Sequence, residues 1–228
     1  MKINERRANS SAAKLSKRGR PKASARSLAA TRQLLIDAGG RAYAEFGYDR
    51  VTMAHILAEA GVSRPTLYKY FANKHDIIQA LTQQALQQLL LAIRHGVNAV
   101  STPLEQVDRA VDAYLCWGAK QGPVCCRFYS EMDHAQSPIA TLRQTLMQQL
   151  NDYFEQQLQI INRPLPDRLM LDALVSAVEF VGSQYFKNND YSASQQSRCQ
   201  RVIMRILLAS LAQEDELQLL PPVPMQVG

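Results

Sequence analysis

Residues 52–71, TMAHILAEAGVSRPTLYKYF, constrain the fold more than any other stretch of this chain. Ile56 and Ala60 belong to an apolar face that recurs at helical spacing. Thr52 can cap the start of that helix through its hydroxyl. Gly61 follows the last apolar residue, where a left-handed conformation favours glycine. The pattern therefore predicts a short helix that ends in a tight turn.

A second short helix follows the turn. Ser63 is a second N-cap, and Pro65 falls in the first turn, where its missing N–H costs nothing. Leu67 and Phe71 are four residues apart and face inward together. A helix of under two turns is not stable alone in water, so it must pack on a scaffold. Its outward face carries residues suited to DNA: Arg64, Thr66, Tyr68, Lys69 and Tyr70. The two helices are predicted to form a helix-turn-helix.

The positive charge of the chain is concentrated before this motif. The formal net charge is +6, yet residues 1–26 carry nine Lys/Arg against Glu5 alone, which leaves the rest of the chain at −2. This arm is poor in large apolar side chains and is predicted to be disordered. A basic arm favours a polyanionic partner. Arg18 and Arg20 lie in KRGRPK, which resembles an AT-hook core and could enter a narrow A·T minor groove or simply attract phosphates.

Four cysteines and no signal peptide indicate a reducing compartment. No apolar run approaches the roughly 18 residues that span a bilayer. We therefore expect no membrane partner and a cytoplasmic, nucleoid-associated protein.

The remaining sequence divides into helices at its glycines, prolines and an Asn-Asn pair. No segment alternates like a strand with hairpin turns. We expect an all-α fold of about nine helices, with an N-terminal three-helix helix-turn-helix domain and a larger helical body. The predicted spans outside the motif are 27–47, 74–95, 104–120, 124–135, 138–162, 167–187 and 193–213.

Residues 31–81 resemble the DNA-binding domain of TetR-family (TetR/AcrR-like) transcriptional repressors. The matching residues are Phe46-Gly47-Tyr48, Thr52, Ile56, Ala60-Gly61-Val62-Ser63, Thr66-Leu67-Tyr68, Tyr70-Phe71 and Asn73-Lys74. The chain departs from the family pattern at Gly39-Gly40, where bulkier helix formers are usual, and at Pro65. Gly39-Gly40 could either permit close helix packing or weaken the first helix.

Together with the basic arm at 1–26, the resemblance implies a DNA-binding domain at 27–88 and an effector-binding and dimerisation domain at 89–228. It also implies contacts with double-stranded DNA, in which Lys74 clamps a phosphate and Arg64 reaches a base edge. The full set of expected DNA-binding residues is Thr52, Ser63, Arg64, Thr66, Tyr68, Lys69, Tyr70, Lys74, Arg18 and Arg20.

The last two predicted helices have more apolar surface than one narrow stripe requires. In TetR-like proteins these helices form the dimer interface. We therefore expect a homodimer that binds a palindromic operator, because each subunit then occupies one half-site.

A cluster of aromatic and sulfur-containing residues in the middle of the chain has two interpretations. It is either plain core or the lining of a pocket for a hydrophobic or aromatic effector. The expected pocket residues are Tyr114, Cys116, Trp117, Cys125, Phe128, Tyr129 and His134.

The sequence thus predicts a ligand-released, sequence-specific repressor. Two alternatives stay open: an architectural A·T-rich DNA binder without a small ligand, and a thiol-redox-sensing regulator that uses Cys116, Cys125 and Cys126. The histidines are scattered and lack ligand spacing with the cysteines, so no metal is expected. No nucleophile motif or phosphate loop accompanies them, so we expect no cofactor and no enzyme activity.

Overall fold

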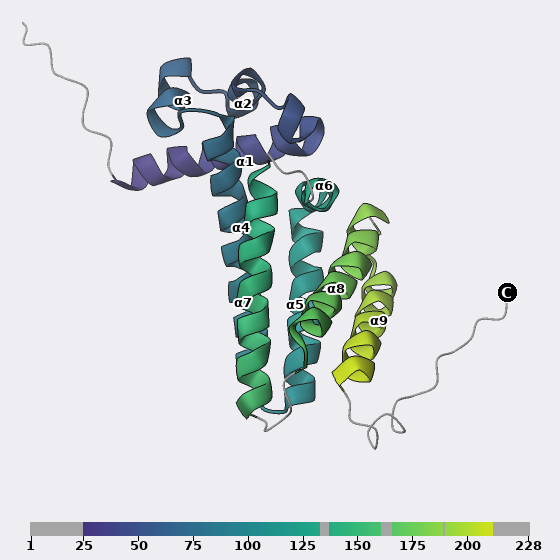
Figure 1. Ribbon diagram of the computed structural model, residues 1–228. Helices are drawn as coiled ribbons and strands as arrows, with labels where there is room; N and C mark the ends of the chain where they lie inside the picture. Colours follow the sequence, from purple (N-terminus) through teal and green to yellow (C-terminus); the bar gives the residue numbers. More distant parts are fainter. Residues whose placement is uncertain (1–24, 133–136, 161–165, 189, 212–228) are drawn as a thin grey trace, which may run out of the picture.

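The computed structural model describes residues 25–132, 137–160, 166–188 and 190–211. These residues form an all-α fold, and Figure 1 shows its arrangement. The helices are α1 (Ala25–Arg50), α2 (Met53–Ala60), α3 (Arg64–Tyr70), α4 (Lys74–Asn98), α5 (Pro103–Gln121), α6 (Pro123–Glu131), α7 (Pro138–Ile160), α8 (Arg168–Asn188) and α9 (Ala193–Leu211).

Side-chain caps fix where several helices begin. Thr52 Oγ1 accepts a hydrogen bond from the His55 N–H at 3.2 Å, and Asn73 Oδ1 accepts one from the Asp76 N–H at 3.0 Å. Thr102 caps α5 in the same way. Each cap satisfies an N–H that would otherwise lack a partner in the first turn. These local bonds explain why the predicted starts agree with the structure.

The N-terminal unit is built on α1, which lies across the end of the molecule with α2 and α3 above it (Figure 1). Leu35 of α1, Ile56 of α2 and Leu67 of α3 are fully buried in one apolar core. The first turns of α4 close this core through Ile77. The short recognition helix is therefore held by packing on its neighbours, as the sequence requires.

The body consists of the long helices α4, α5 and α7 with α8 and α9 beside them (Figure 1). Its core is centred on Leu115 and Phe186, both fully buried. Two glycines allow side chains to approach closely, because a Cβ at Gly118 would overlap the Phe186 ring and one at Gly182 would overlap Tyr114. Helix α4 runs without a break through residues 88–89, where the sequence suggests a domain boundary.

The glycine pair of α1 permits close helix packing. A Cβ on Gly39 would overlap Cγ2 of the buried Ile77, and one on Gly40 would lie 3.3 Å from Leu81 Cδ1. The first helix also continues beyond its predicted end. Gly47 adopts φ 74°, ψ 171° and kinks the chain, and a further turn follows to Arg50.

None of the helices in the described ranges has the length and apolar character needed to cross a membrane.

Candidate nucleic-acid interface

The turn between α2 and α3 is set by Gly61 and Ser63. Gly61 adopts the left-handed conformation, φ 63° and ψ 23°, and its N–H donates to Leu57 O at 3.1 Å. Ser63 Oγ accepts from the Thr66 N–H at 3.4 Å and also bonds to Thr66 Oγ1 at 2.8 Å. Pro65 stands in the first turn of α3 without disturbing the cap. The helix-turn-helix geometry predicted from the sequence is present.

Helix α3 has one buried face and one exposed face. Leu67 is fully buried, and Phe71, which ends the helix, is nearly so. Arg64 and Lys69 are exposed, and 44% of Tyr68 is exposed. The Arg64 guanidinium lies over the Tyr68 ring, with 5.7 Å between Cζ and the ring centroid. This arrangement leaves a cation, an aromatic ring and a second cation free to meet DNA.

Other expected contact residues are partly engaged within the protein. Tyr70 packs half-buried against the N-terminal core, and Lys69 Nζ lies 5.9 Å from the Tyr70 ring centroid. The Thr66 hydroxyl bonds to Ser63, so its reach toward a base competes with the cap. Thr52 is exposed at the start of α2. Arg18 and Arg20 lie outside the described residues.

Lys74 has a second task that the sequence did not reveal. Its Nζ donates to Tyr48 O at 2.6 Å and to Asp49 O at 3.0 Å, and it lies 5.0 Å from the Tyr48 ring centroid. The Tyr48 hydroxyl bonds to His75 Nδ1 at 2.8 Å. The start of α4 is thus tied to the end of α1, and the predicted phosphate contact would share this ammonium group.

A narrow, mainly apolar cavity lies in the body, about 80 Å³ in volume. Three of the predicted pocket residues, Trp117, Phe128 and Tyr129, line it. Met132, which follows α6 and belongs to the same cluster in the sequence, also lines it. The other lining residues come from α4, α7 and α8, and the sequence argument missed them: Thr82, Ala85, Leu86, Leu89, Ile139, Leu142, Arg143, Leu146 and Glu179. Helical periodicity shows that these residues belong to amphipathic helices, but it does not show which helices pack around a common cavity.

The remaining predicted pocket residues lie elsewhere. Tyr114 is buried behind the cavity, where its hydroxyl bonds to the Tyr129 hydroxyl at 2.5 Å. Burial raises the pKa of both phenols well above the ordinary value, so both stay protonated. Cys125 is fully buried core. Cys116 faces α9, where Gln196 Nε2 lies 3.2 Å from its Sγ. His134 lies outside the described residues.

Two charged residues, Arg143 and Glu179, also line this cavity. Arg143 donates to Glu179, with 2.6 Å between Nη2 and Oε2 and a further bond from Nε. The Glu179 side chain is 13% exposed and that of Arg143 is 30% exposed. The pair neutralises two charges beside an apolar space, which favours a ligand that is mostly apolar.

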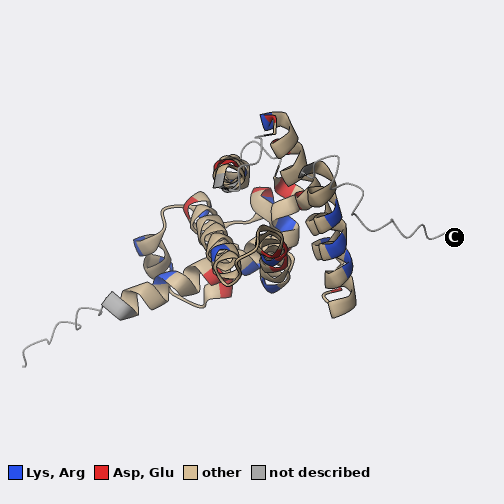
Figure 2. Cartoon of the chain, turned by 90° about the horizontal axis from the view of Figure 1, so that it is seen from below, with Lys and Arg blue, Asp and Glu red and all other residues tan. Residues whose placement is uncertain are grey.

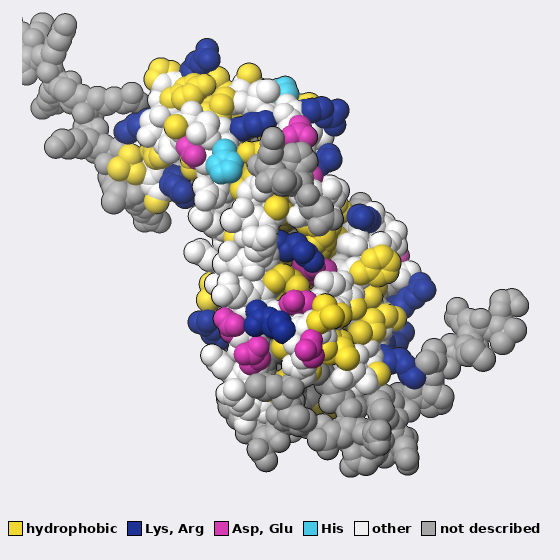
Figure 3. All heavy atoms as spheres, viewed as in Figure 1, with side chains coloured by type: hydrophobic (Ala, Val, Ile, Leu, Met, Phe, Trp, Pro, Cys, Tyr) yellow, Lys and Arg dark blue, Asp and Glu magenta, His cyan; other side chains and the backbone are white. Residues whose placement is uncertain are grey.

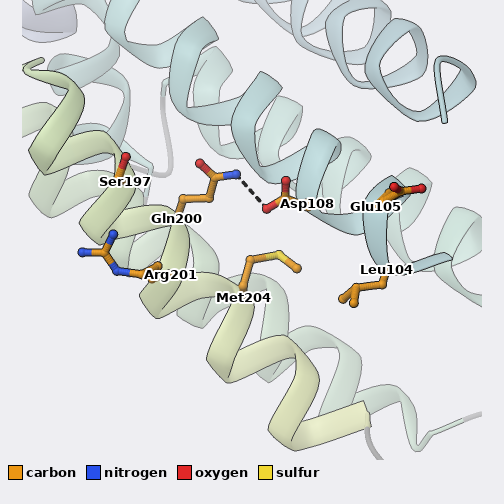
Figure 4. A pocket seen from close by; sticks show the side chains of 7 residues that line it. All are labelled: Leu104, Glu105, Asp108, Ser197, Gln200, Arg201 and Met204. Atoms are coloured by element: carbon orange, nitrogen blue, oxygen red, sulfur yellow. Dashed lines mark hydrogen bonds between the residues drawn. The ribbon is translucent and has the colours of Figure 1, made fainter. Parts of the chain in front are cut away.

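A larger and more open groove of about 520 Å³ lies between α5 and α9 (Figure 4). Gln200 of α9 donates to Asp108 of α5 at 2.7 Å across it. Leu104 and Met204 supply apolar surface at one end of the groove in Figure 4, and the Arg201 guanidinium points away from Asp108. Figure 2 shows several Lys and Arg residues, in blue, along α9. The groove is open and of mixed polarity, so it is a weaker candidate for a small-molecule site.

Comparison with known proteins gives a consistent picture. Residues 35–81 match the model of the family described as bacterial regulatory proteins, tetR family. The chain is 30% identical over 83 residues to the HTH-type transcriptional activator FasR of Mycolicibacterium smegmatis, covering 36% of this chain and 37% of that protein. It is 32% identical over 81 residues to the HTH-type transcriptional repressor Rv1474c of Mycobacterium tuberculosis, covering 35% of this chain and 43% of that protein. The alignments thus span less than half the length of these relatives.

The likeness to solved structures extends further along the chain. The fatty acid degradation regulator FadR from Bacillus halodurans superposes with a TM-score of 0.67, at 19% sequence identity, over 81% of this chain and 97% of that one. At this identity the match shows a shared fold, and it covers far more of the chain than the sequence alignments do.

Proposed function

We propose that this chain, which belongs to the TetR family of bacterial regulatory proteins, is a homodimeric, sequence-specific transcriptional repressor. It binds a palindromic operator through α3 and leaves it when a small apolar effector occupies the body. The proposal that the protein binds DNA rests on the structure of α3. This helix is held from behind by the buried Leu67 and presents Arg64, Tyr68 and Lys69 to solvent.

Dimerisation is supported by the outer surface of α8 and α9. Four large apolar side chains there are exposed, including Phe180 at 66% and Leu169 at 76%. Met170 and Val202 are the other two. Figure 3 shows hydrophobic side chains gathered on the part of the molecule where α8 and α9 lie. An exposed apolar surface of this kind marks an interaction surface, and a second copy of the chain would present the same surface.

The effector site is the cavity lined by α4, α5, α6, α7 and α8. Its leucines, aromatic rings and neutralised ion pair suit a molecule with an apolar body. A structural neighbour is named a fatty acid degradation regulator, so acyl-chain compounds are the first class to test. The effector must bind the DNA-free state more tightly than the DNA-bound state, because equal affinity shifts no equilibrium.

The first experiment is selection of genomic DNA fragments by the purified full chain at near-physiological salt. We expect enrichment of a short palindrome. Broad A·T-rich enrichment without dyad symmetry would instead support the architectural alternative.

A truncation separates the two functions further. In the repressor, removal of residues 1–24 should weaken binding to all DNA and reduce its salt dependence, while the preferred palindrome is retained. In an architectural binder the same truncation should remove most of the binding. Replacing the arm's arginines by lysine, which keeps the charge, is the matched control for minor-groove insertion by Arg18 and Arg20.

The effector proposal is tested on the selected palindrome. Free fatty acids and acyl thioesters of graded chain length should release the DNA with an optimum length. Leu146→Trp fills the cavity and should abolish this response without loss of DNA affinity. Leu91→Trp, at an exposed position of α4, is the control and should respond like the wild type. Release of both variants by the same compounds would place the effector site elsewhere.

A further inference from the structure

Helix α6 touches the DNA-binding unit at the kinked end of α1 (Figure 1). Glu131, its last residue, accepts two hydrogen bonds from α1 residues. The Tyr43 hydroxyl donates to Oε2 at 2.9 Å, and the Tyr48 N–H donates to Oε1 at 3.0 Å. One carboxylate therefore joins the two sides of the kink at Gly47.

Gly47 makes room for this carboxylate. Its φ of +74° is in the left-handed region, and a Cβ there would lie 2.7 Å from Glu131 Oε1. A side chain at this position would be strained and would push the carboxylate away. The kink and the carboxylate are thus mutually dependent.

Arg127 lies one turn earlier on α6, and its side chain binds backbone carbonyl groups at the same end of α1. Its Nη2 donates to Ala44 O at 3.1 Å and to Glu45 O at 3.3 Å. Carbonyls at the end of a helix lack intrahelical donors, and a guanidinium supplies charge-assisted bonds to them. Arg127 and Glu131 are four residues apart and share one face of α6. Arg127 donates to the carbonyl groups before the kink, and Glu131 accepts hydrogen bonds from residues on both sides of it.

Apolar packing also stabilises the contact between α6 and α1. The Tyr43 ring is fully buried and lies 5.7 Å from the Phe128 ring, centroid to centroid. Tyr43, Ile78 and Ile139 form a small core where α1, α4 and α7 meet. Burial and the nearby Glu131 carboxylate raise the pKa of the Tyr43 phenol, so the hydroxyl remains a donor at any physiological pH. Phe128 also lines the body cavity, together with Tyr129 and with Met132, which follows α6.

We propose that Glu131, assisted by Arg127, is a positioning residue that fixes the angle between the DNA-binding unit and the body. The contact with α6 is a polar connection between these parts, in addition to the continuous helix α4 and the apolar packing of Ile139 on Tyr43. In a dimer this angle sets the separation of the two recognition helices, which must be about 34–36 Å for successive major grooves. The proposal rests on the dimeric DNA-binding function proposed above and assigns the residues that give the dimer its operator spacing.

The test is selection from a library in which two fixed half-sites are separated by spacers of different length. Wild-type protein should enrich one spacer. Glu131→Ala should enrich several, with palindrome affinity reduced about tenfold, as expected for losing hydrogen bonds to a charged group. Its affinity for an isolated half-site should stay within about twofold of wild type. Ser130→Ala, at an exposed position of the same helix, is the control and should behave like wild type.

Two results would overturn the proposal. One is an unchanged spacer preference and palindrome affinity in a folded Glu131→Ala protein. The other is an equal loss of affinity for the palindrome and the half-site, which indicates a general structural role. If Glu131→Ala does not fold, Tyr43→Phe decides by the same criteria, because it removes one of the two bonds and keeps the ring.

A measurement without DNA separates this proposal from the proposed function. Spin labels carried on non-natural residues at the exposed positions 54 of α2 and 148 of α7 report the angle by pulsed electron resonance, with labelled protein diluted into unlabelled protein. Glu131→Ala should broaden the distance distribution relative to wild type. A narrow, unchanged distribution would refute the positioning role even if a palindrome is found. A broadened one would support it even if the wild type selects no palindrome.

Discussion

Lys74 Nζ lies 2.6 Å from the Tyr48 carbonyl oxygen, and this bond joins the first residue of α4 to the last turn of α1. The same ammonium group donates to Asp49 O at 3.0 Å. The residue that family resemblance assigns to a DNA phosphate therefore also ties α1 to α4, the helix that continues into the body.

Lys74→Met should lower both stability and DNA affinity. Loss of the charged donor leaves two carbonyls without this partner, so the free energy of unfolding should fall by about 1–3 kcal/mol. If Lys74 also binds a phosphate, affinity should fall equally for all DNA sequences, and the slope of log K against log salt should decrease by about 1. Urea unfolding and salt titrations measure these effects. Lys69→Met is the control for stability, since Lys69 is exposed on α3; an equal loss in both variants would argue against the tie.

Arg64→Lys should relax base preference at one symmetric pair of operator positions. A lysine keeps the charge but cannot make a bidentate contact with guanine, so about 1–3 kcal/mol of discrimination should disappear there. Binding to unrelated DNA should hardly change. Repeating the fragment selection with the variant measures this. Arg41→Lys, in an exposed ion pair with Glu59, should leave the selected motif intact. A uniform loss on all DNA would show that Arg64 contacts phosphate.

The adjacent glycines of α1 should respond differently to alanine. Gly39→Ala introduces a Cβ that overlaps the buried Ile77, and overpacking of this kind costs about 1–3 kcal/mol. Gly40→Ala meets the end of the flexible Leu81 side chain at 3.3 Å and makes an ordinary contact with Val124 Cγ2 at 3.8 Å, so the helix-propensity gain of up to about 1 kcal/mol should offset the closer contact. Thermal unfolding of the two variants compares the effects at neighbouring positions. Equal changes in unfolding temperature would mean that helix propensity, and not the close packing of α1 on α4, determines the effect at both positions.

Cys125 should be unreactive in the folded protein. Burial raises the pKa of its thiol, and neighbouring Cys126 raises it further, so the thiolate fraction at pH 8 lies below that of a free cysteine. Iodoacetamide labelling at pH 8, followed by peptide mass spectrometry, should leave Cys125 unmodified until urea is added. Burial also raises the pKa of Cys199, which should react more slowly than in the unfolded chain. Rapid modification of native Cys125 with loss of DNA binding would favour the thiol-redox alternative.

Much of the architecture follows from short-range signals in the sequence. Hydroxyl and amide caps at Thr52, Ser63 and Asn73, the glycine at position 61, and the periodicity between them predict α2, α3 and the start of α4 with little error. These signals succeed because caps, left-handed turns and helical faces depend on residues within one or two turns of each other. The outward residues of α3 follow from the same periodicity.

The tertiary structure decided which distant residues meet. Glu131 bonds to Tyr43 and Tyr48, 88 and 83 residues earlier in the chain, and no pattern local to α6 indicates this. The cavity similarly takes residues from five helices, while Cys116 turns toward α9 and Cys125 into the core. An amphipathic pattern identifies a buried face but not the helix against which it packs, because that choice depends on the relative placement of all the helices. The sequence alone therefore determined the helices and the DNA-binding motif. The packing of those helices determined the cavity and the contacts of α6 with the DNA-binding unit.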